Sequence, residues 1–274
     1  MEARLQRRIQ RYAWDRAARD YEPLWRVQLA GAHAQLLAYA ALAPGERVLD
    51  VACGTGLVTF AAAAAVGPRG EVVGVDLAEQ MIEAARRRAT ARAATNTAFA
   101  RMDAEQLALP AASFDVALCA FGLMFMPDPE RAVLEMRRVV RPGGRIAIAA
   151  WGERARCQWA ESFPIIDAEV TTEVCPLFFR MGQGEMLARA CATAGFAAIE
   201  QRRLAVTMDY ENAEQACCAT FNGGPFALAW SRFDDEVRTR VRTRYLQSIA
   251  PWQRGDGYRI PAEFVVVAAV VPEA

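Results

Sequence analysis

The sequence predicts an α/β fold in which a mostly parallel β-sheet is covered by helices on both faces. Short, nearly continuous apolar runs such as EVVGVDL and RIAIAAW alternate with helical patterns between residues 44 and 151. Strands that are apolar on both sides are typical of parallel sheets buried between helices. In addition, 54% of the 274 residues are hydrophobic and 23% are charged, which is typical of a globular protein.

Residues 1–43 are predicted to form helices that precede the sheet. Aromatic side chains, among them Tyr12 and Tyr21, interrupt an arginine-rich stretch, and the apolar run LAGAHAQLLAYAALA follows it. The sequence APGE then ends the helical pattern before the first strand, because proline and glycine interrupt regular structure.

Strands and helices alternate along the next segment. We expect strands at RVLDVA, EVVGVDL, NTAFARMDA, SFDVALCAFG and RIAIAAW, and helices at AEQMIEAARRRATARA and DPERAVLEMRRVV. The second helix is well marked, because Asp128 can cap its first turn, Pro129 fits there, and arginines crowd its last turn. The sequence RPGG should end this helix before the next strand begins.

After Trp151 the pattern changes. Residues 152–181 carry many aromatic side chains and no strand pattern, and the helix GEMLARACATAGF and the strand AAIEQRRLAVTMDY come next. Residues 211–258 look helical, with an apolar residue every four positions from Phe233 to Tyr245, which indicates one buried stripe. The run EFVVVAAVV is the predicted final strand.

The charge balance argues against several classes of partner. Lys and Arg together number 32, as do Asp and Glu, so no net field attracts nucleic acid or acidic lipid. The longest apolar runs are far shorter than the ~20 residues of a membrane span, and the charged N-terminal stretch lacks the apolar core of a signal peptide. We therefore expect a cytoplasmic protein without integral membrane association.

The seven cysteines show neither a Cys-x-x-Cys pair nor a regular spacing. Zinc sites and disulfide frameworks depend on such spacing, so we expect no metal site and mostly buried thiols in a reducing compartment.

The run VLDVACGTGLVTF predicts a strand, a glycine-rich turn and a helix. Gly54 and Gly56 would let a ligand approach the backbone closely, as glycines do in dinucleotide-binding loops. A diphosphate would, however, be repelled by Asp50 near the end of the strand. S-adenosylmethionine carries a sulfonium, an ammonium and no phosphate, so an acid at this position would favour it. The turn therefore predicts a site for this cationic nucleoside.

Two further acids follow the next two strands. Asp76 is placed to accept bonds from both ribose hydroxyls, an interaction that would suit NAD equally well. Asp103 ends the strand AFARMD, where a carboxylate can accept a hydrogen bond from the adenine amino group. Each acid alone could simply cap the helix that follows it. Together with Gly54 and Gly56, three acids at successive strand ends favour an S-adenosylmethionine site at the carboxyl edge of the sheet.

The motifs VLDVACGTG, VVGVDLAEQMIEAAR and RMDAEQLALPAASFDVALCAFGLMFMPDPERAVLEMRRVVRPGGRI together resemble the class I S-adenosylmethionine-dependent methyltransferases. The resemblance covers roughly residues 45–151 and is greatest to the branch of ubiquinone and menaquinone C-methyltransferases. It implies a Rossmann-like, seven-stranded, mostly parallel sheet with an antiparallel last strand, here EFVVVAAVV. We predict a single methyltransferase domain, 1–274, with an N-terminal helical lid (1–43), a cofactor-binding core (44–151) and two cap insertions (152–181 and 211–258).

The resemblance also implies roles for individual residues. In this family the residues that match the glycine turn wrap the methionine part of the cofactor. Those that match Asp76 and Leu77 hold the ribose. Those that match Asp103 and Ala104 hold the adenine, and the positions just after the fourth strand border the cofactor.

Two N-terminal tyrosines belong to the same pattern. Tyr12 and Tyr21, in the stretch YAWDRAARDYEPLW, would close over the cofactor. Ala52 departs from the family, because many members have glycine there, and we expect this change to be mild. The predicted cofactor-binding residues are Tyr12, Tyr21, Asp50, Ala52, Cys53, Gly54, Thr55, Gly56, Asp76, Leu77, Met81, Asp103, Ala104, Cys119 and Ala120.

The predicted function is transfer of a methyl group by in-line displacement to a small, largely apolar metabolite, with S-adenosyl-L-homocysteine as the product. The acceptor atom is carbon, oxygen or nitrogen, and the aromatic cap slightly favours an aromatic or quinone-like acceptor. Tyr21 and His33 are the candidates for a general base, although a lone histidine in an apolar helix is more often structural. The predicted substrate pocket comprises Phe121, Phe125, Trp151, Phe179 and Trp252.

Other functions are weighed against this one. An NAD-linked oxidoreductase is disfavoured by Asp50 and by Thr59, which stands where a third glycine would be sought. A regulatory or assembly protein that binds the cofactor without transferring its methyl group is excluded by no feature of the sequence. Nucleic-acid methylation is disfavoured by the balanced charge, so the expected partner is a small-molecule acceptor. A homodimer is compatible with the sequence.

Overall fold

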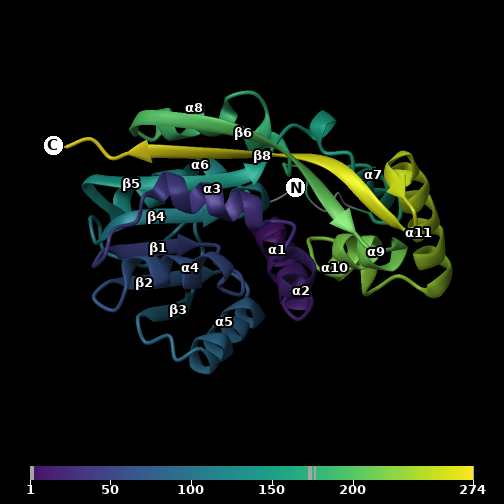
Figure 1. The fold of residues 1–274 in the computed structure, drawn as a ribbon, viewed down its shortest axis with the longest axis horizontal. Helices are drawn as coiled ribbons and strands as arrows, with labels where there is room; N and C mark the ends of the chain where they lie inside the picture. Colours follow the sequence, from purple (N-terminus) through teal and green to yellow (C-terminus); the bar gives the residue numbers. More distant parts are fainter. Residues whose placement is uncertain (1–2, 172–174, 176, 274) are drawn as a thin grey trace.

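The computed structural model describes residues 3–171, 175 and 177–273, which form one β-sheet with helices on both faces and a helical region at one end (Figure 1). Seven strands are hydrogen-bonded in the order β3-β2-β1-β4-β5-β8-β6, and the short strand β7 pairs with β8. The pairs among β1 to β5 are parallel, whereas β8 is antiparallel to both β5 and β6. The predicted Rossmann-like sheet with an antiparallel last strand is therefore confirmed. The strands are β1 Arg47–Val51, β2 Glu71–Asp76, β3 Thr97–Arg101, β4 Phe114–Ala120, β5 Val140–Trp151, β6 Ala197–Tyr210, β7 Gln253–Arg254 and β8 Gly257–Val270.

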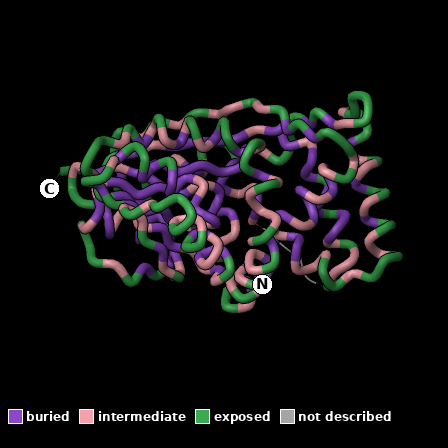
Figure 2. The backbone as a smooth tube through the Cα atoms, turned by 60° about the horizontal axis from the view of Figure 1, so that its bottom comes forward, coloured by how far each residue is buried: buried purple, intermediate pink, exposed green. Residues whose placement is uncertain are grey.

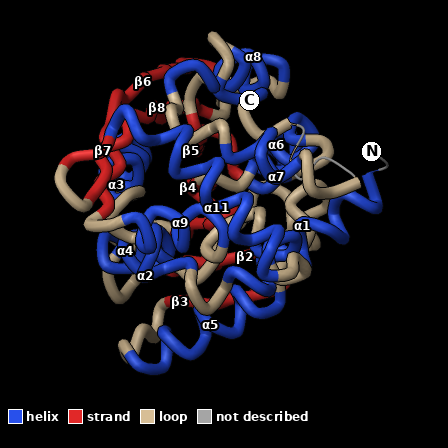
Figure 3. Tube along the Cα trace, turned by 90° about the vertical axis from the view of Figure 1, so that its right-hand side faces the viewer, coloured by secondary structure: helices blue, strands red, loops and turns tan. Residues whose placement is uncertain are grey.

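Helices flank the sheet on both sides. Helices α3 and α4 contact each other on one face, and α6 and α8 contact each other on the opposite face, as Figure 3 shows. Asp128 caps α6 as predicted, since its Oδ1 accepts a hydrogen bond of 2.9 Å from the backbone N–H of Arg131. These helices are α3 Ala30–Ala40, α4 Leu57–Val66, α5 Glu79–Ala91, α6 Pro129–Val139 and α8 Met186–Thr193.

The core lies where the strands are apolar on both faces. Strands β1, β4, β5 and β8 are buried over most of their length, and Figure 2 shows these central strands in purple. The edge strand β6 instead has mostly exposed or half-buried residues. This difference follows from position, because only the central strands are covered on both faces by helices.

A helical region lies beyond the end of the sheet, at the right of Figure 1. Its longest helix, α11, buries Val241, Tyr245 and Ile249 along one stripe. Two members of the predicted stripe, Val241 and Tyr245, are thus buried, whereas Val237 is half-buried and Phe233 lies before the helix begins. The elements here are η2 Arg154–Arg156, α7 Ser162–Asp167, η3 Arg180–Gly182, α9 Ala213–Phe221, α10 Ala227–Trp230, α11 Asp235–Ile249 and η4 Ala250–Trp252. Residues 172–174 and 176 of the predicted insertion 152–181 lie outside the described residues.

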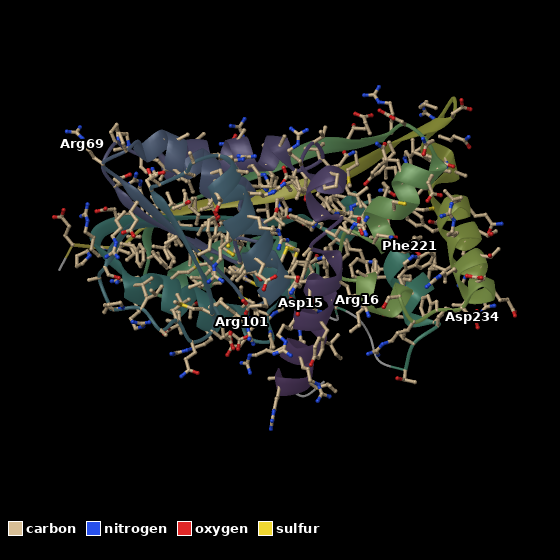
Figure 4. All side chains as sticks on the ribbon, turned by 90° about the horizontal axis from the view of Figure 1, so that it is seen from below. Asp15, Arg16, Arg69, Arg101, Phe221 and Asp234 are labelled. Carbon is tan, nitrogen blue, oxygen red and sulfur yellow. The ribbon has the colours of Figure 1, made fainter. Side chains whose placement is uncertain are left out.

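The N-terminal helix α1 lies between the sheet and this helical region. It contacts α5 beside the sheet and α10 in the helical region. In Figure 4, Asp15 and Arg16 of α1 accordingly lie between Arg101 of β3 and Phe221 of α9. The N-terminal helices are α1 Ala3–Ala17 and α2 Tyr21–Trp25. A short 3₁₀ element, η1 Leu123–Phe125, follows β4.

The prediction of helices throughout 211–258 was wrong at its C-terminal end. There β7 and the start of β8 form a tight hairpin in which Gly255 has a φ of 60°. The sequence RGDG supplies the glycine that such a positive φ favours. The last strand therefore begins at Gly257 rather than at Glu263, and it is longer than the predicted EFVVVAAVV.

Two strand ends also differ from the prediction. RPGG does not separate α6 from the next strand, because β5 starts at Val140 and accommodates the glycines through a shift of its register against β4. Strand β3 ends at Arg101, so Asp103 lies in the turn after the strand and not at its last position.

Candidate functional site

A cavity lies at the carboxyl edge of the sheet, where the segments that follow β1, β2, β3 and β4 meet helix α1. We name it the edge cavity. The space between its walls is about 770 Å³, a figure that includes open solvent. Its walls are formed by Arg7, Gln10, Arg11, Trp14, Tyr21, Ala52, Gly54, Val75, Asp76, Leu77, Ala78, Met81, Met102, Asp103, Ala104, Glu105, Ala120, Phe121, Gly122, Phe125, Met126 and Pro127.

The turn after β1 brings bare backbone to this cavity. Gly54 has a φ of 55° and Gly56 a φ of 88°, conformations that glycine adopts without strain. A Cβ on Gly54 would lie 3.8 Å from Cε1 of Tyr21, so glycine keeps the space in front of the turn open. Ala52 has a φ of 55°, which costs an L-residue about 1–2 kcal/mol. The replacement of the family's glycine by Ala52 therefore adds backbone strain that the sequence did not reveal, and its mild effect stays a prediction.

Asp76, at the end of β2, presents its carboxylate to the edge cavity. Its Oδ2 accepts a hydrogen bond of 2.9 Å from the backbone N–H of Gly54, and its Oδ1 accepts one of 2.9 Å from that of Ala78. Burial raises the pKa of Asp76 to about 6, and these two hydrogen bonds oppose the rise. The carboxylate is thus held in one orientation, and each oxygen keeps a lone pair with which to accept a ligand hydroxyl.

Asp50 lies beneath the turn and does not line the edge cavity. It is 1% exposed, and its Oδ2 accepts a hydrogen bond of 2.5 Å from the Thr59 hydroxyl, while its Oδ1 has no partner among the described residues. Burial raises the pKa of Asp50 to about 7. From the sequence we expected Asp50 to be a fixed charge that faces the ligand. The structure makes it a buried acid that would act through the turn, because β1 continues past it to Val51.

Asp103 lines the edge cavity but is already engaged. Its carboxylate lies 3.1 Å from Nε of Arg7, and its Oδ1 accepts a hydrogen bond of 3.0 Å from the backbone N–H of Glu105. Arg7 also forms an ion pair with Glu105, which is buried. An adenine amino group would therefore share Asp103 with an arginine that the sequence analysis did not assign to the site.

Helix α1 supplies a wall that the sequence analysis missed. Arg7, Gln10, Arg11 and Trp14 all face the edge cavity. The helix is held to the core by Arg7 and by Asp15, whose Oδ1 accepts a hydrogen bond of 2.9 Å from the backbone N–H of Gln80. The signal was the spacing of positions 7, 10, 11 and 14, which share one face of a helix. Arginine is so frequent throughout this chain that the pattern did not stand out.

The two predicted tyrosines have different positions. Tyr21 lines the edge cavity, with its ring centroid 5.7 Å from that of Trp14. Tyr12 is 45% exposed, with Arg11 over its ring, and is not on the cavity wall, because it points from the outer face of α1. Burial, reinforced by the carboxylates of Asp76 and Asp50, raises the pKa of Tyr21 well above its usual value. Its hydroxyl therefore stays protonated, which makes it a hydrogen-bond donor and not a general base.

The remaining predicted cofactor residues divide into two groups. Ala52, Leu77, Met81, Ala104 and Ala120 line the edge cavity together with Gly54, Asp76 and Asp103. Cys53, Thr55, Gly56 and Cys119 are buried and, within the part of the chain that the structure describes, are not on its wall.

The positions off the wall have local explanations. Cys53 packs in a small cluster with Phe60 and Phe99, on the far side of the turn. The Thr55 hydroxyl accepts a hydrogen bond of 3.1 Å from Arg88, which turns this side chain toward α5. Cys119 is fully buried within β4.

A second cavity adjoins the first, and we name it the aromatic cavity. Phe121 and Phe125 line both cavities, and Trp151 lines the aromatic cavity only. Phe179 packs its ring against Phe163 and Trp159 and does not reach either wall. Trp252 is half-buried in η4, also away from both walls as far as the described residues go. Three of the five predicted substrate residues are thus brought together.

His33, the other candidate base, lies on α3 outside both cavities. Its ring centroid is 6.0 Å from that of Phe121. Burial lowers its pKa to about 4, so the imidazole is neutral near pH 7. Its position favours a structural role.

Among the residues that the structure describes, no three His, Cys, Asp or Glu side chains gather as metal ligands would. Over the same residues, every helix is too short or too polar to cross a bilayer.

Part of the chain matches a known protein family. Residues 48–144 match the model of a family described as a methyltransferase domain. This segment contains the glycine turn, Asp76 and Asp103, and it ends in β5. It omits helix α1 and the whole helical region beyond the sheet.

The chain is also similar, over part of its length, to curated proteins. The chain is 41% identical over 127 residues to the aklanonic acid methyltransferase DauC of Streptomyces sp. (strain C5), which covers 46% of this chain and 56% of that protein. It is 46% identical over 112 residues to the ubiquinone/menaquinone biosynthesis C-methyltransferase UbiE of Ralstonia pickettii (strain 12J), with coverage of 41% and 46%. The chain thus spans about half the length of the curated relatives it matches.

The overall fold is also similar to that of solved structures. One is the Haemonchus contortus phosphoethanolamine N-methyltransferase 2 in complex with S-adenosyl-L-methionine. The TM-score is 0.61 at 19% identity, and the similarity covers 94% of this chain and 57% of the other. At this identity the comparison supports the fold alone.

Proposed function

Because residues 48–144 carry a methyltransferase domain, we propose that this chain transfers a methyl group from S-adenosyl-L-methionine to a small, largely apolar metabolite. The observation that carries the proposal is the geometry of Asp76. Its carboxylate stands on the wall of the edge cavity, oriented by the N–H groups of Gly54 and Ala78, and can accept both hydroxyls of a ribose.

The other residues of the edge cavity fit the same cofactor. Gly54 leaves room beside Tyr21 for the methionine part, and Asp103 with Ala104 stands where the adenine would lie. The unpartnered Oδ1 of Asp50 lies under the turn, and a positive charge above it would favour the ionised acid. A diphosphate at the turn would lie near the carboxylate of Asp76 and above the buried Asp50, which disfavours NAD.

The chain's own contribution to methyl transfer is binding and positioning. When bound, the cofactor supplies an activated methyl group: its carbon–sulfur bond breaks as the bond to the acceptor forms, the electron pair stays on sulfur, and the acceptor's proton leaves to solvent. The aromatic rings of Tyr21, Phe121 and Phe125 exclude water from the cavity walls. Orientation of the two reactants can supply ~7–11 kcal/mol of the barrier.

Calorimetric titration of the full chain tests this proposal directly. S-adenosylmethionine and S-adenosylhomocysteine should bind at one site per chain, and NAD should not. Turnover is then followed by mass spectrometric detection of S-adenosylhomocysteine with a panel of phenols, hydroquinones and amines. Binding of NAD alone would overturn the proposal. Tight binding of S-adenosylmethionine without product on any acceptor would favour a cofactor-binding protein that does not transfer the methyl group.

The proposal extends to the setting in which the chain works. A small-molecule acceptor is supported by the enclosed, aromatic walls beside the edge cavity. Two relatives are named for small molecules, one as an aklanonic acid methyltransferase and the other as a ubiquinone/menaquinone biosynthesis C-methyltransferase. The cytoplasmic location, the absence of nucleic-acid partners and the homodimer stay predictions.

A further inference from the structure

The aromatic cavity is a distinct space beside the edge cavity, between the N-terminal helices and the helical region. It has a volume of about 500 Å³, part of it open to solvent. Four side chains line both cavities and form a collar between them: Trp14, Tyr21, Phe121 and Phe125. The remaining wall consists of Trp25, Leu29, Trp151, Trp159, Phe178, Thr220, Gly224, Pro225 and Phe226.

This wall carries no charged side chain among the residues that the structure describes. Its side-chain hydroxyls are those of Tyr21 and Thr220, and Thr220 is already paired, since its Oγ1 lies 2.8 Å from the Tyr245 hydroxyl. The edge cavity, in contrast, has Arg7 and Asp76 on its wall. Because an unpaired charge is costly to bury, the aromatic cavity selects an uncharged ligand.

The rings of the wall are packed edge to face. The ring centroids of Trp151 and Trp159 lie 4.7 Å apart, those of Trp159 and Phe178 5.7 Å, and those of Phe125 and Phe178 5.5 Å. Such contacts fix the planes of the rings and leave flat faces for a ligand to stack on. A rigid cavity with aromatic walls fits a flat ring system better than a flexible chain.

We infer that the aromatic cavity holds the methyl acceptor, that this acceptor is an uncharged, flat ring system, and that it reaches the cofactor through the collar of Trp14, Tyr21, Phe121 and Phe125. The inference rests on the proposed function, because the edge cavity must hold the methyl donor. The described residues of the aromatic wall offer no base, since Tyr21 stays protonated and His33 lies outside. The acceptor therefore loses its proton to solvent through the open part of the cavity.

Gly224 is the position on the aromatic wall where a larger side chain would fill the cavity. The residue is buried, its φ lies outside the left-handed region, and an added Cβ would meet only the Thr220 carbonyl oxygen, at 3.9 Å. Because Gly224 is shielded from solvent, the empty space beside it belongs to the cavity. A larger side chain at this position should fill the cavity without straining the backbone.

The test measures ligand binding without turnover. The probe is 2-naphthol, an uncharged flat ring system, titrated calorimetrically into the full chain saturated with S-adenosylhomocysteine. We expect Gly224→Leu to weaken 2-naphthol binding at least tenfold, and the charged analogue naphthalene-2-sulfonate to bind the unaltered chain at least tenfold more weakly than 2-naphthol. The matched control is Gly31→Leu, which adds the same side chain on the exposed surface of α3, where nothing lies within 4 Å. It should bind 2-naphthol as the unaltered chain does.

The outcomes separate this inference from the proposed function. Absence of 2-naphthol binding, equal binding of the sulfonate, or undiminished binding by Gly224→Leu would each overturn the inference while S-adenosylhomocysteine still binds. Failure of S-adenosylhomocysteine to bind the unaltered chain would overturn the proposed function instead. Unchanged S-adenosylhomocysteine affinity in Gly224→Leu shows that the variant is folded. If it does not fold, Gly224→Val provides a smaller filling with the same expected direction.

Discussion

The edge cavity and the aromatic cavity share a collar but differ in how their walls are built. The edge cavity takes most of its wall from the segments that follow four neighbouring strands, and it is rich in charge. The aromatic cavity draws Trp25, Trp151, Trp159 and Phe226 from segments far apart in the sequence, and it is apolar. Most of the edge wall lies within residues 48–144, which match a methyltransferase domain, whereas most of the aromatic wall lies outside this segment.

The difference suggests separate tasks. A sheet edge places backbone N–H groups and carboxylates at fixed positions, which suits a cofactor with several polar groups. The aromatic cavity lies between the N-terminal helices and the helical region. Substitutions in these helices can therefore alter its shape without altering the sheet. The following predictions test whether the two cavities respond independently, starting with the largest expected effect.

Phe221→Ala should damage the helical region most. Phe221 is fully buried, stacks on Trp230 at a centroid distance of 4.6 Å, and lies 5.3 Å from the ring of Tyr245. Removal of a buried phenylalanine ring costs about 3–5 kcal/mol of unfolding free energy. Urea denaturation measures this loss, and the half-buried Phe233→Ala is the control with a smaller effect. If the two cavities are independent, 2-naphthol binding falls in Phe221→Ala while S-adenosylmethionine affinity in the folded protein persists.

Asp76→Ala should act on the edge cavity, and so on cofactor binding, rather than on the helical region. The substitution removes the acceptor for the ribose hydroxyls and leaves the N–H groups of Gly54 and Ala78 without a partner. A charge-assisted hydrogen bond contributes about 1.5–3 kcal/mol, so S-adenosylmethionine affinity should fall about 10- to 150-fold. Calorimetry measures the change, with the exposed Asp256→Ala as the control. Unchanged affinity would contradict the ribose assignment.

The same contrast explains how far the sequence alone could lead. The central strands along the chain, the turn at Gly54 and the position of Asp76 were predictable, because apolar runs and strand ends are local features of the chain. The part of the wall that α1 supplies was not predictable. In the sequence Arg7 cannot be told from the many surface arginines, and only the folded structure brings it to Asp103. The aromatic cavity was predicted only in part. Phe178 and Phe179 are neighbours in the same aromatic-rich segment, so the sequence does not distinguish them. Packing alone decides that the ring of Phe178 reaches the cavity.

Lower pH should weaken cofactor binding through the edge cavity alone. With a pKa of about 6, Asp76 is mostly ionised at pH 7 and mostly protonated at pH 5. Only the ionised carboxylate can accept both ribose hydroxyls fully, so S-adenosylmethionine affinity should decrease about tenfold from pH 7 to pH 5. Calorimetry across this range measures the effect, and it should be smaller in Asp76→Asn, where only the buried Asp50 still titrates beneath the turn. The uncharged 2-naphthol provides the contrast, because its binding should stay constant over the same range.

Ala52→Gly should give the smallest effect and the only gain in stability. The φ of 55° at Ala52 is strained for an L-residue by about 1–2 kcal/mol, and glycine relieves this strain. Glycine also loses more backbone entropy on folding, by about 0.5–1 kcal/mol, so the net stabilisation should be about 0–1.5 kcal/mol. Urea denaturation measures it, and Ala61→Gly in the exposed part of α4 is the control that should lose stability. Because Ala52 lines the edge cavity and is not on the aromatic wall, 2-naphthol affinity should be the same in Ala52→Gly as in the unaltered chain. A loss of stability in Ala52→Gly would show that the turn after β1 is held by contacts of the alanine methyl group and not merely strained by its backbone.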